Sequence, residues 1–77
     1  MKRKNVVSSN LKSVGYDKKT GTLEVEFKTD SVYDYFEVPE DVYKALMNAD
    51  SIGSYFAAFI RNRYRYSLVG KENGQKD

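Results

Sequence analysis

The segment TLEVEFK at residues 22–28 constrains the fold more than any other part of the chain. Its apolar residues Leu23, Val25 and Phe27 alternate without a break with polar residues that include Glu24 and Glu26. This period of two predicts a β-strand with one face in the core and one face in water. Such a strand needs neighbouring elements that cover its apolar side.

A second strand is expected immediately before it. The segment SVGYDKKTG at residues 13–21 places Val14 and Tyr16 two residues apart and then enters a polar turn. Asp17 accepts backbone hydrogen bonds in such turns, and Gly21 tolerates a positive φ. The two segments together predict an antiparallel hairpin.

A third strand is expected at SVYDYFEV, residues 31–38, which is rich in β-forming side chains. Tyr33 and Tyr35 occupy one face of this strand, and Asp34 lies on the other. Because a lone carboxylate is costly in a small core, we expect the face with the two tyrosines to point inward. A β-bulge that shifts the pairing by one residue is the alternative.

Two short helices should follow the third strand. Pro39 suits the first helical position, and the acidic residues after it favour a helix start. Apolar residues then recur at helical spacing through Ala49. Asp50 or Ser51 can cap a second helix, whose apolar stripe runs from Ile52 to Phe59.

The predicted fold is α+β, with a three-stranded antiparallel meander followed by, and packed against, two short helices. The segment YRYSLV at residues 64–69 also has a period of two, so it can return as a short fourth strand at the sheet edge. We expect a basic amino-terminal arm at 1–7, a single domain at 8–69 and a polar, disordered tail at 70–77.

The composition argues against most enzyme chemistry. The 77 residues include no histidine and no cysteine, so the usual nucleophile systems and transition-metal sites cannot be assembled. We therefore expect no catalytic residue, no metal and no cofactor. The longest apolar run, residues 55–60, is far shorter than the roughly 20 residues that cross a bilayer, and no secretory signal is visible. A cytoplasmic protein without a membrane span is the expectation.

The charges are distributed unevenly, although the net charge is only +2. Residues 13–50 hold nine acidic residues against four lysines, whereas both flanking segments are basic. Arginine side chains form bidentate hydrogen bonds with phosphate groups, and tyrosine rings stack on bases. The candidate nucleic-acid-binding residues are Lys2, Arg3, Lys4, Arg61, Arg63, Tyr64, Arg65 and Tyr66. Arg61 and Arg63 have an alternative role, which is to end the second helix. The alternative role of Tyr64 and Tyr66 is to anchor the tail.

Several short motifs, taken in order, resemble the KTSC domain family. They are SSN at 8–10, VGYD at 14–17, TLEVEF at 22–27, the Tyr33-x-Tyr35 pair followed by Val38-Pro39, and SIGSYF at 51–56 leading into IRNRY. The family takes its name from the carboxyl end of some lysyl-tRNA synthetases, and it also occurs as free-standing bacterial and phage proteins. The resemblance implies a small domain of unestablished function, for which RNA binding has been proposed.

The Tyr33-x-Tyr35 pair has two interpretations. Aromatic side chains on an open sheet hold single-stranded bases in several RNA-binding folds. If the open face carries Glu24 and Glu26, however, those carboxylates repel phosphate, so we favour a core role for the two tyrosines.

Two functions remain open. The first is a small, non-catalytic module that contacts RNA, either tRNA-like or single-stranded, through its basic ends. The second is a protein-interaction module of bacterial or prophage origin that offers an exposed sheet edge or the acidic strand face. Basic ends that share one face favour the first function, and basic ends separated by the acidic sheet favour the second.

Overall fold

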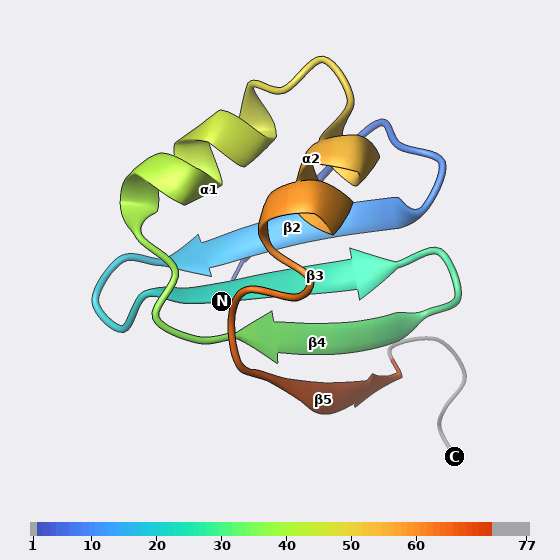
Figure 1. The fold of residues 1–77 in the computed structure, drawn as a ribbon. Helices are drawn as coiled ribbons and strands as arrows, with labels where there is room; N and C mark the ends of the chain where they lie inside the picture. The colour runs from blue at the N-terminus through green and yellow to red at the C-terminus, as the bar shows by residue number, and fades with distance from the viewer. Residues whose placement is uncertain (1, 72–77) are drawn as a thin grey trace.

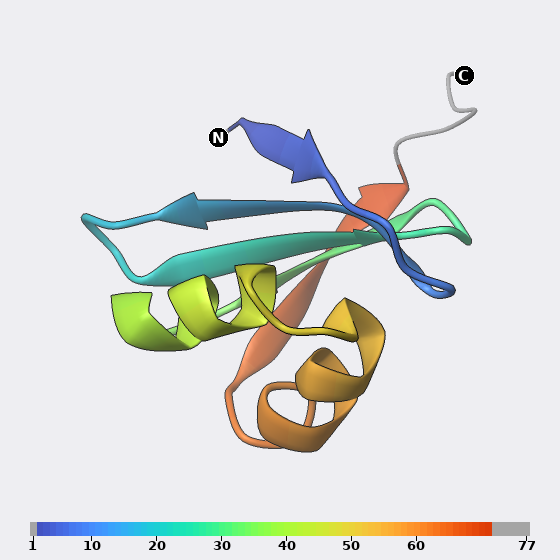
Figure 2. The same cartoon turned by 90° about the horizontal axis from the view of Figure 1, so that it is seen from above.

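The structure is a computed structural model, and it describes residues 2–71. Its elements are β1 (Arg3–Asn5), β2 (Leu11–Asp17), β3 (Thr22–Phe27), β4 (Ser31–Tyr35), α1 (Glu40–Met47), α2 (Ile52–Phe59) and β5 (Tyr66–Lys71). The strands form one antiparallel sheet in the order β1-β2-β3-β4-β5, and both helices lie on the same face of it (Figures 1 and 2). The α+β class is confirmed, but the sheet has five strands where three or four were predicted.

The β2–β3 hairpin forms as the sequence predicts. The amide of Gly21 donates to the Asp17 carbonyl over 2.8 Å, and Gly21 has a φ of +73°. The Asp17 carboxylate accepts a hydrogen bond from the Lys19 amide over 2.9 Å. The two residues thus close the turn in the roles expected of them.

The core lies between the sheet and the helices. Tyr35 points into it and is only 3% exposed, and Tyr33 packs against its rim, so the inward orientation of this strand face is confirmed. The alternative, a bulge that shifts the register, is not found in the pairing of β4 with β3, which is regular; the register shift of β4 occurs in its pairing with β5, between Val32 and Tyr33. The buried core cluster consists of Leu11, Val14, Leu23, Val25, Tyr35, Val38, Leu46, Phe56 and Ile60.

The helices begin close to their predicted positions. Pro39 is the N-cap of α1, one residue earlier in the helix than expected. Of the two residues expected to cap α2, Asp50 and Ser51, it is Ser51 whose hydroxyl accepts from the Ser54 amide. A Cβ atom at Gly53 would lie 3.0 Å from the Ser8 hydroxyl oxygen, so the glycine leaves room for the segment before β2. Within the described part of the chain, neither helix has the length and apolarity needed to span a membrane.

The strand β1 was not predicted, because residues 3–5 were assigned to a basic arm. Arg3 pairs with Gly15 and Asn5 pairs with Ser13, and β1 turns toward the face opposite the helices (Figure 2). On that face Glu26 is only 6% exposed. The prediction of a wet strand face was therefore wrong for Glu26.

The carboxyl-terminal segment also joins the sheet. The strand β5 pairs with β4 along the edge, and it includes Gly70 and Lys71, which the sequence assigned to the tail. The rest of the predicted tail, residues 72–77, lies outside the described residues. The sheet edges are therefore formed by β1 on one side and β5 on the other.

Candidate nucleic-acid interface

The chain segment after α2 brings polar residues over the edge of the sheet. The amides of Ile60 and Arg61 both donate to the Phe56 carbonyl over 3.0 Å, so the backbone continues for part of a turn beyond the helix. The Phe36 amide then donates to the Arg65 carbonyl over 2.9 Å and fixes the chain at the end of β4. The turn between these contacts carries Arg61 and Asn62 above β4 and β5.

A cleft of about 390 Å³ lies between this turn and the sheet. Its lining consists of Phe27, Thr29, Ser31, Tyr33, Tyr35, Arg61, Asn62 and Tyr66. The sheet side is mostly aromatic and the α2 side is polar. Arg61 is the only charged residue of the lining within the described part of the chain, so a ligand meets a cation and no carboxylate there, which favours an anionic ligand.

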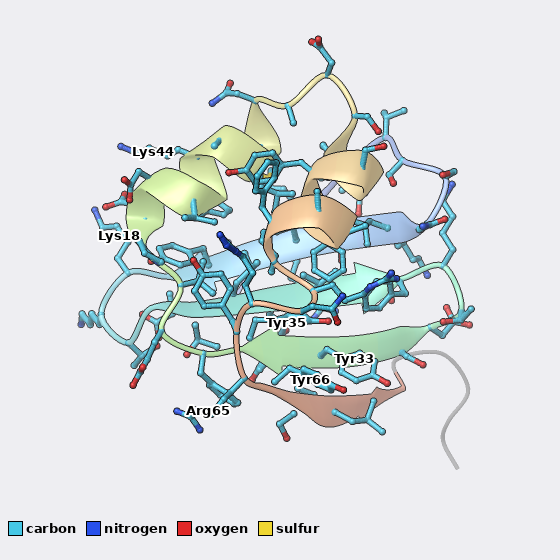
Figure 3. The ribbon with its side chains drawn as sticks, in the orientation of Figure 1. Lys18, Tyr33, Tyr35, Lys44, Arg65 and Tyr66 are labelled. Atoms are coloured by element: carbon cyan, nitrogen blue, oxygen red, sulfur yellow. The ribbon has the colours of Figure 1, made fainter. Side chains whose placement is uncertain are left out.

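The tyrosines of the cleft come from neighbouring strands. Figure 3 shows Tyr33 of β4 and Tyr66 of β5 side by side, with ring centroids 5.7 Å apart and planes inclined by 68°. Tyr35 lies 5.5 Å from Tyr66 at 42°. Phe27 meets Tyr33 edge to face at 82°. Tyr66 is 58% exposed, so this cluster reaches the surface.

The polar groups of the cleft are available to a ligand. Among residues 2–71, no lining side chain makes a hydrogen bond or an ion pair with another protein group. Burial and, after it, the neighbouring Tyr33 and Tyr66 together raise the pKa of the Tyr35 hydroxyl to about 12, and the charge of Arg61 opposes this shift. The hydroxyl therefore stays protonated at neutral pH and remains a hydrogen-bond donor.

The other predicted residues of this segment lie outside the cleft lining. Tyr64 is partly buried and packs against the core, which is the anchoring role considered for it. The Arg63 side chain is exposed. The Arg65 guanidinium lies 5.6 Å from the centre of the Phe36 ring and 3.9 Å from a Glu37 carboxylate oxygen, and it points away from Tyr66 (Figure 3). Of the five residues predicted in this segment, Arg61 and Tyr66 line the cleft.

The amino-terminal basic residues lie at the opposite edge of the sheet. Because β1 and β5 are four strand spacings apart, about 19 Å separates them. Lys2 borders a more open hollow at the β2–β3 turn with Tyr16, Asp17, Lys18 and Lys19. Lys4 is exposed on β1. The structure therefore divides the two groups of predicted residues and does not unite them in one surface.

Arg3 has a role of its own on the face opposite the helices. It forms an ion pair with Glu24 and lies 3.7 Å from Glu26, and its Nε donates to the Ser13 hydroxyl over 2.9 Å. Ser13 in turn donates to Glu26 over 2.8 Å. Lys12 lies 3.6 Å from the second Glu26 oxygen. The carboxylates of Glu24 and Glu26 are thus paired with cations of the protein itself.

Asp34, on the same face, has a carboxylate oxygen, Oδ1, that is buried and not hydrogen-bonded to any described residue. Burial and, after it, the adjacent Glu24 together raise the pKa of Asp34 to about 6, and the nearby Arg3 guanidinium acts against this shift. Across residues 2–71, no group of three acidic side chains is close enough to hold a metal ion.

Sequence reasoning missed four residues of the cleft: Phe27, Thr29, Ser31 and Asn62. Phe27 carried the pattern of a core residue, and Thr29 and Ser31 that of a polar turn. No local signal joins them to the end of α2. Their proximity follows from the return of the chain along β4, which brings residues distant in the sequence to one sheet edge.

The comparison with known families agrees with this architecture. The family model described as the KTSC domain matches residues 7–64. The chain belongs to the KTSC domain family. The crystal structure of a KTSC domain protein from Yersinia pestis superimposes with a TM-score of 0.87 at 33% identity, covering 90% of this chain and 97% of that one. The fold described above is thus a KTSC fold.

Relatives of this KTSC chain are of two kinds. An uncharacterized protein of Stutzerimonas stutzeri is 46% identical over 67 residues, which cover 86% of this chain and 94% of that protein. A lysine–tRNA ligase of Nostoc punctiforme is 43% identical over 61 residues, but these are only 11% of its length. A KTSC segment is therefore one small part of such ligases and nearly the whole of other bacterial proteins.

Proposed function

We propose that this protein is a small, non-catalytic RNA-binding module that holds a single strand at the cleft between the end of α2 and strands β4 and β5. The observation that carries the proposal is the convergence of Arg61 with Tyr33, Tyr35 and Tyr66 around one hollow without a carboxylate in its lining. Arginine and tyrosine together supply the phosphate contact and the stacking surface that a single strand needs. The cytoplasm is the compartment in which we expect this function.

The face of the sheet opposite the helices is less suited to bind RNA than the cleft. There, Arg3 is engaged with Glu24 and Ser13, so its charge is already paired within the protein. Arg61 has no such acidic partner among residues 2–71. The proposal therefore rests on the carboxyl-terminal residues alone, and Lys2, Arg3 and Lys4 are not required for it. The similarity to a segment of lysine–tRNA ligases is consistent with an RNA ligand.

Fluorescence anisotropy with labelled single-stranded RNA and a tRNA, across a salt series, tests the proposal. We expect salt-dependent binding by the wild type and a large loss in an Arg61/Arg63/Arg65 triple alanine variant. A Lys2/Lys4 double alanine variant is the control, because it removes positive charge at the other sheet edge. The proposal fails if the wild type does not bind at low salt or if the triple variant binds as the wild type does.

A protein partner that adds a strand to β5 is the second candidate. The separation of the two basic ends favours it. So does the edge of β5, which pairs with no further strand among residues 2–71 and where Tyr66, Leu68 and Val69 are each more than half exposed. The acidic strand face is less suited to a basic partner, since Arg3 and Lys12 already contact its carboxylates. Enrichment of one protein in a pull-down after nuclease treatment, lost on a Leu68→Lys substitution, would support this candidate.

A further inference from the structure

Among the described residues, the aromatic rings of the cleft are inclined to one another and none is stacked in parallel. The Tyr33–Tyr66 and Phe27–Tyr33 pairs meet edge to face, at 68° and 82°, and Tyr35 is inclined to Tyr66 by 42°. Elsewhere in the molecule the Tyr16 and Tyr43 rings are nearly parallel, 9° apart at 4.7 Å, and cover each other. Stacking therefore fulfils a structural role at Tyr16, whereas the exposed ring of Tyr66 is left with a surface on which a flat ligand can stack.

The size of the cleft limits what can enter. Its volume of about 390 Å³ falls in the lower part of the range of small-molecule sites, roughly 300–1,000 Å³. A base within a duplex is stacked on both faces and cannot reach such a hollow, whereas a base in a single strand can turn into it. The hollow therefore has room for one unpaired base.

The polar lining matches the edge of a base. The protonated Tyr35 hydroxyl donates a hydrogen bond, and the Asn62 amide both donates and accepts. The hydroxyls of Thr29 and Ser31 add groups of both kinds. Arg61 at the rim supplies a cation for the phosphate that accompanies the base. These groups have no hydrogen-bond partners among residues 2–71, so a ligand displaces no internal contact.

We infer that the cleft is a pocket for one nucleobase turned out of an RNA single strand, which stacks on Tyr66 while Asn62 and Tyr35 contact its edge. This inference rests on the proposed RNA-binding function and specifies how that function is performed. It separates recognition of the base, by the sheet residues and Asn62, from recognition of the phosphate, by Arg61. The two contributions can be removed independently.

A single-stranded RNA that carries one 2-aminopurine among uridines tests the inference, since the fluorescence of this base reports its stacking. We expect its emission to change on binding to the wild type and to Tyr66→Phe. For Tyr66→Ala we expect about tenfold weaker binding and no such change. Phe59→Ala is the matched control, because Phe59 is an aromatic residue that is 50% exposed and lies outside the cleft lining. Asn62→Ala provides a second variant and should weaken binding with Tyr66 intact.

The outcomes separate this inference from the proposed function. If RNA binding depends on the arginines but is unchanged in Tyr66→Ala and Asn62→Ala, the base pocket is wrong and RNA binding stands. If RNA does not bind at all, both are wrong. Equal affinity for a duplex of the same sequence would overturn the single-strand requirement, and equal affinity for free AMP would overturn the assignment to a strand.

Discussion

The Arg3 side chain lies across the place that a side chain at Gly15 would occupy. A Cβ atom at Gly15 would be 2.9 Å from Arg3 Cγ and 2.6 Å from the backbone oxygen of Lys2. Because part of this contact is with backbone, the strand β1 must move if residue 15 is larger than glycine. The absent side chain is what allows Arg3 to reach Glu24 on the next strand but one.

Gly15→Ala should therefore destabilise the protein by about 1–3 kcal/mol, as overpacking of a close contact does. Urea unfolding followed by circular dichroism measures the loss. A chain without residues 1–5 is the control background, since it has no β1 for the new methyl group to displace. An equal loss in both backgrounds would contradict this explanation of Gly15.

The stability should depend on pH through Asp34, whose pKa is raised to about 6 from the ordinary value of 3.8. Between these values the folded chain binds more protons than the unfolded chain, so the contribution of Asp34 to stability falls as the pH rises. Asp34→Asn should remove this loss and make the protein more stable at pH 7. The thermal midpoints of both proteins are measured from pH 4 to 7. If the two midpoints change with pH in the same way, Asp34 is not the source of the pH dependence.

The salt dependence of RNA binding should identify Arg61. Each phosphate contact with a single strand contributes about 0.7 to the slope of log affinity against log salt concentration. We expect Arg61→Gln to lower the slope by about this amount. Arg65→Gln is the matched control, because Arg65 lies over Phe36 and outside the cleft lining. Equal changes in the two variants would show that the cleft does not direct the phosphate contact.

The hydroxyl of Tyr16 should contribute measurably to stability. It donates to the Val38 carbonyl just before α1, and the Tyr16 ring stacks on Tyr43 of that helix. Tyr16→Phe keeps the ring and removes the hydrogen bond, so we expect a loss of about 1 kcal/mol. Tyr43→Phe keeps the same stack and removes a hydroxyl without a hydrogen-bond partner among residues 2–71, and it should be nearly neutral. Denaturant titrations of the two variants measure these losses. Equal losses in both would show that the Tyr16 hydrogen bond does not contribute.

Local patterns were sufficient where a residue is placed by its own element. The alternation in residues 22–28 placed Leu23 and Val25 in the core, and the cost of burying Asp34 oriented Tyr35 correctly. The cap of α2 was narrowed to Asp50 or Ser51, because such a cap bonds to an amide of the same helix, and Ser51 is the one that does so. Each of these predictions depends on groups a few residues apart.

Local patterns failed where the position of a residue depends on distant strands. The RKN segment of β1 has no apolar alternation, and its pairing depends on the small size of Gly15 and on Glu24. Since β1 was missed, Glu26 was expected to be solvated. The cleft was missed for a similar reason, because Thr29 and Asn62 are distant in the sequence and line one hollow only in the folded chain.

The order of the strands also has a consequence for folding. The strands β1 to β4 follow one another through short turns, whereas residues 36–65, with both helices, separate β4 from β5. Closing the longer loop costs more chain entropy, so we expect β5 to pair last and to open first. Its amides should exchange with solvent faster than those of β3. A ligand that contacts Tyr66 would then stabilise the last strand to pair. Its binding would be visible as slower amide exchange along β5.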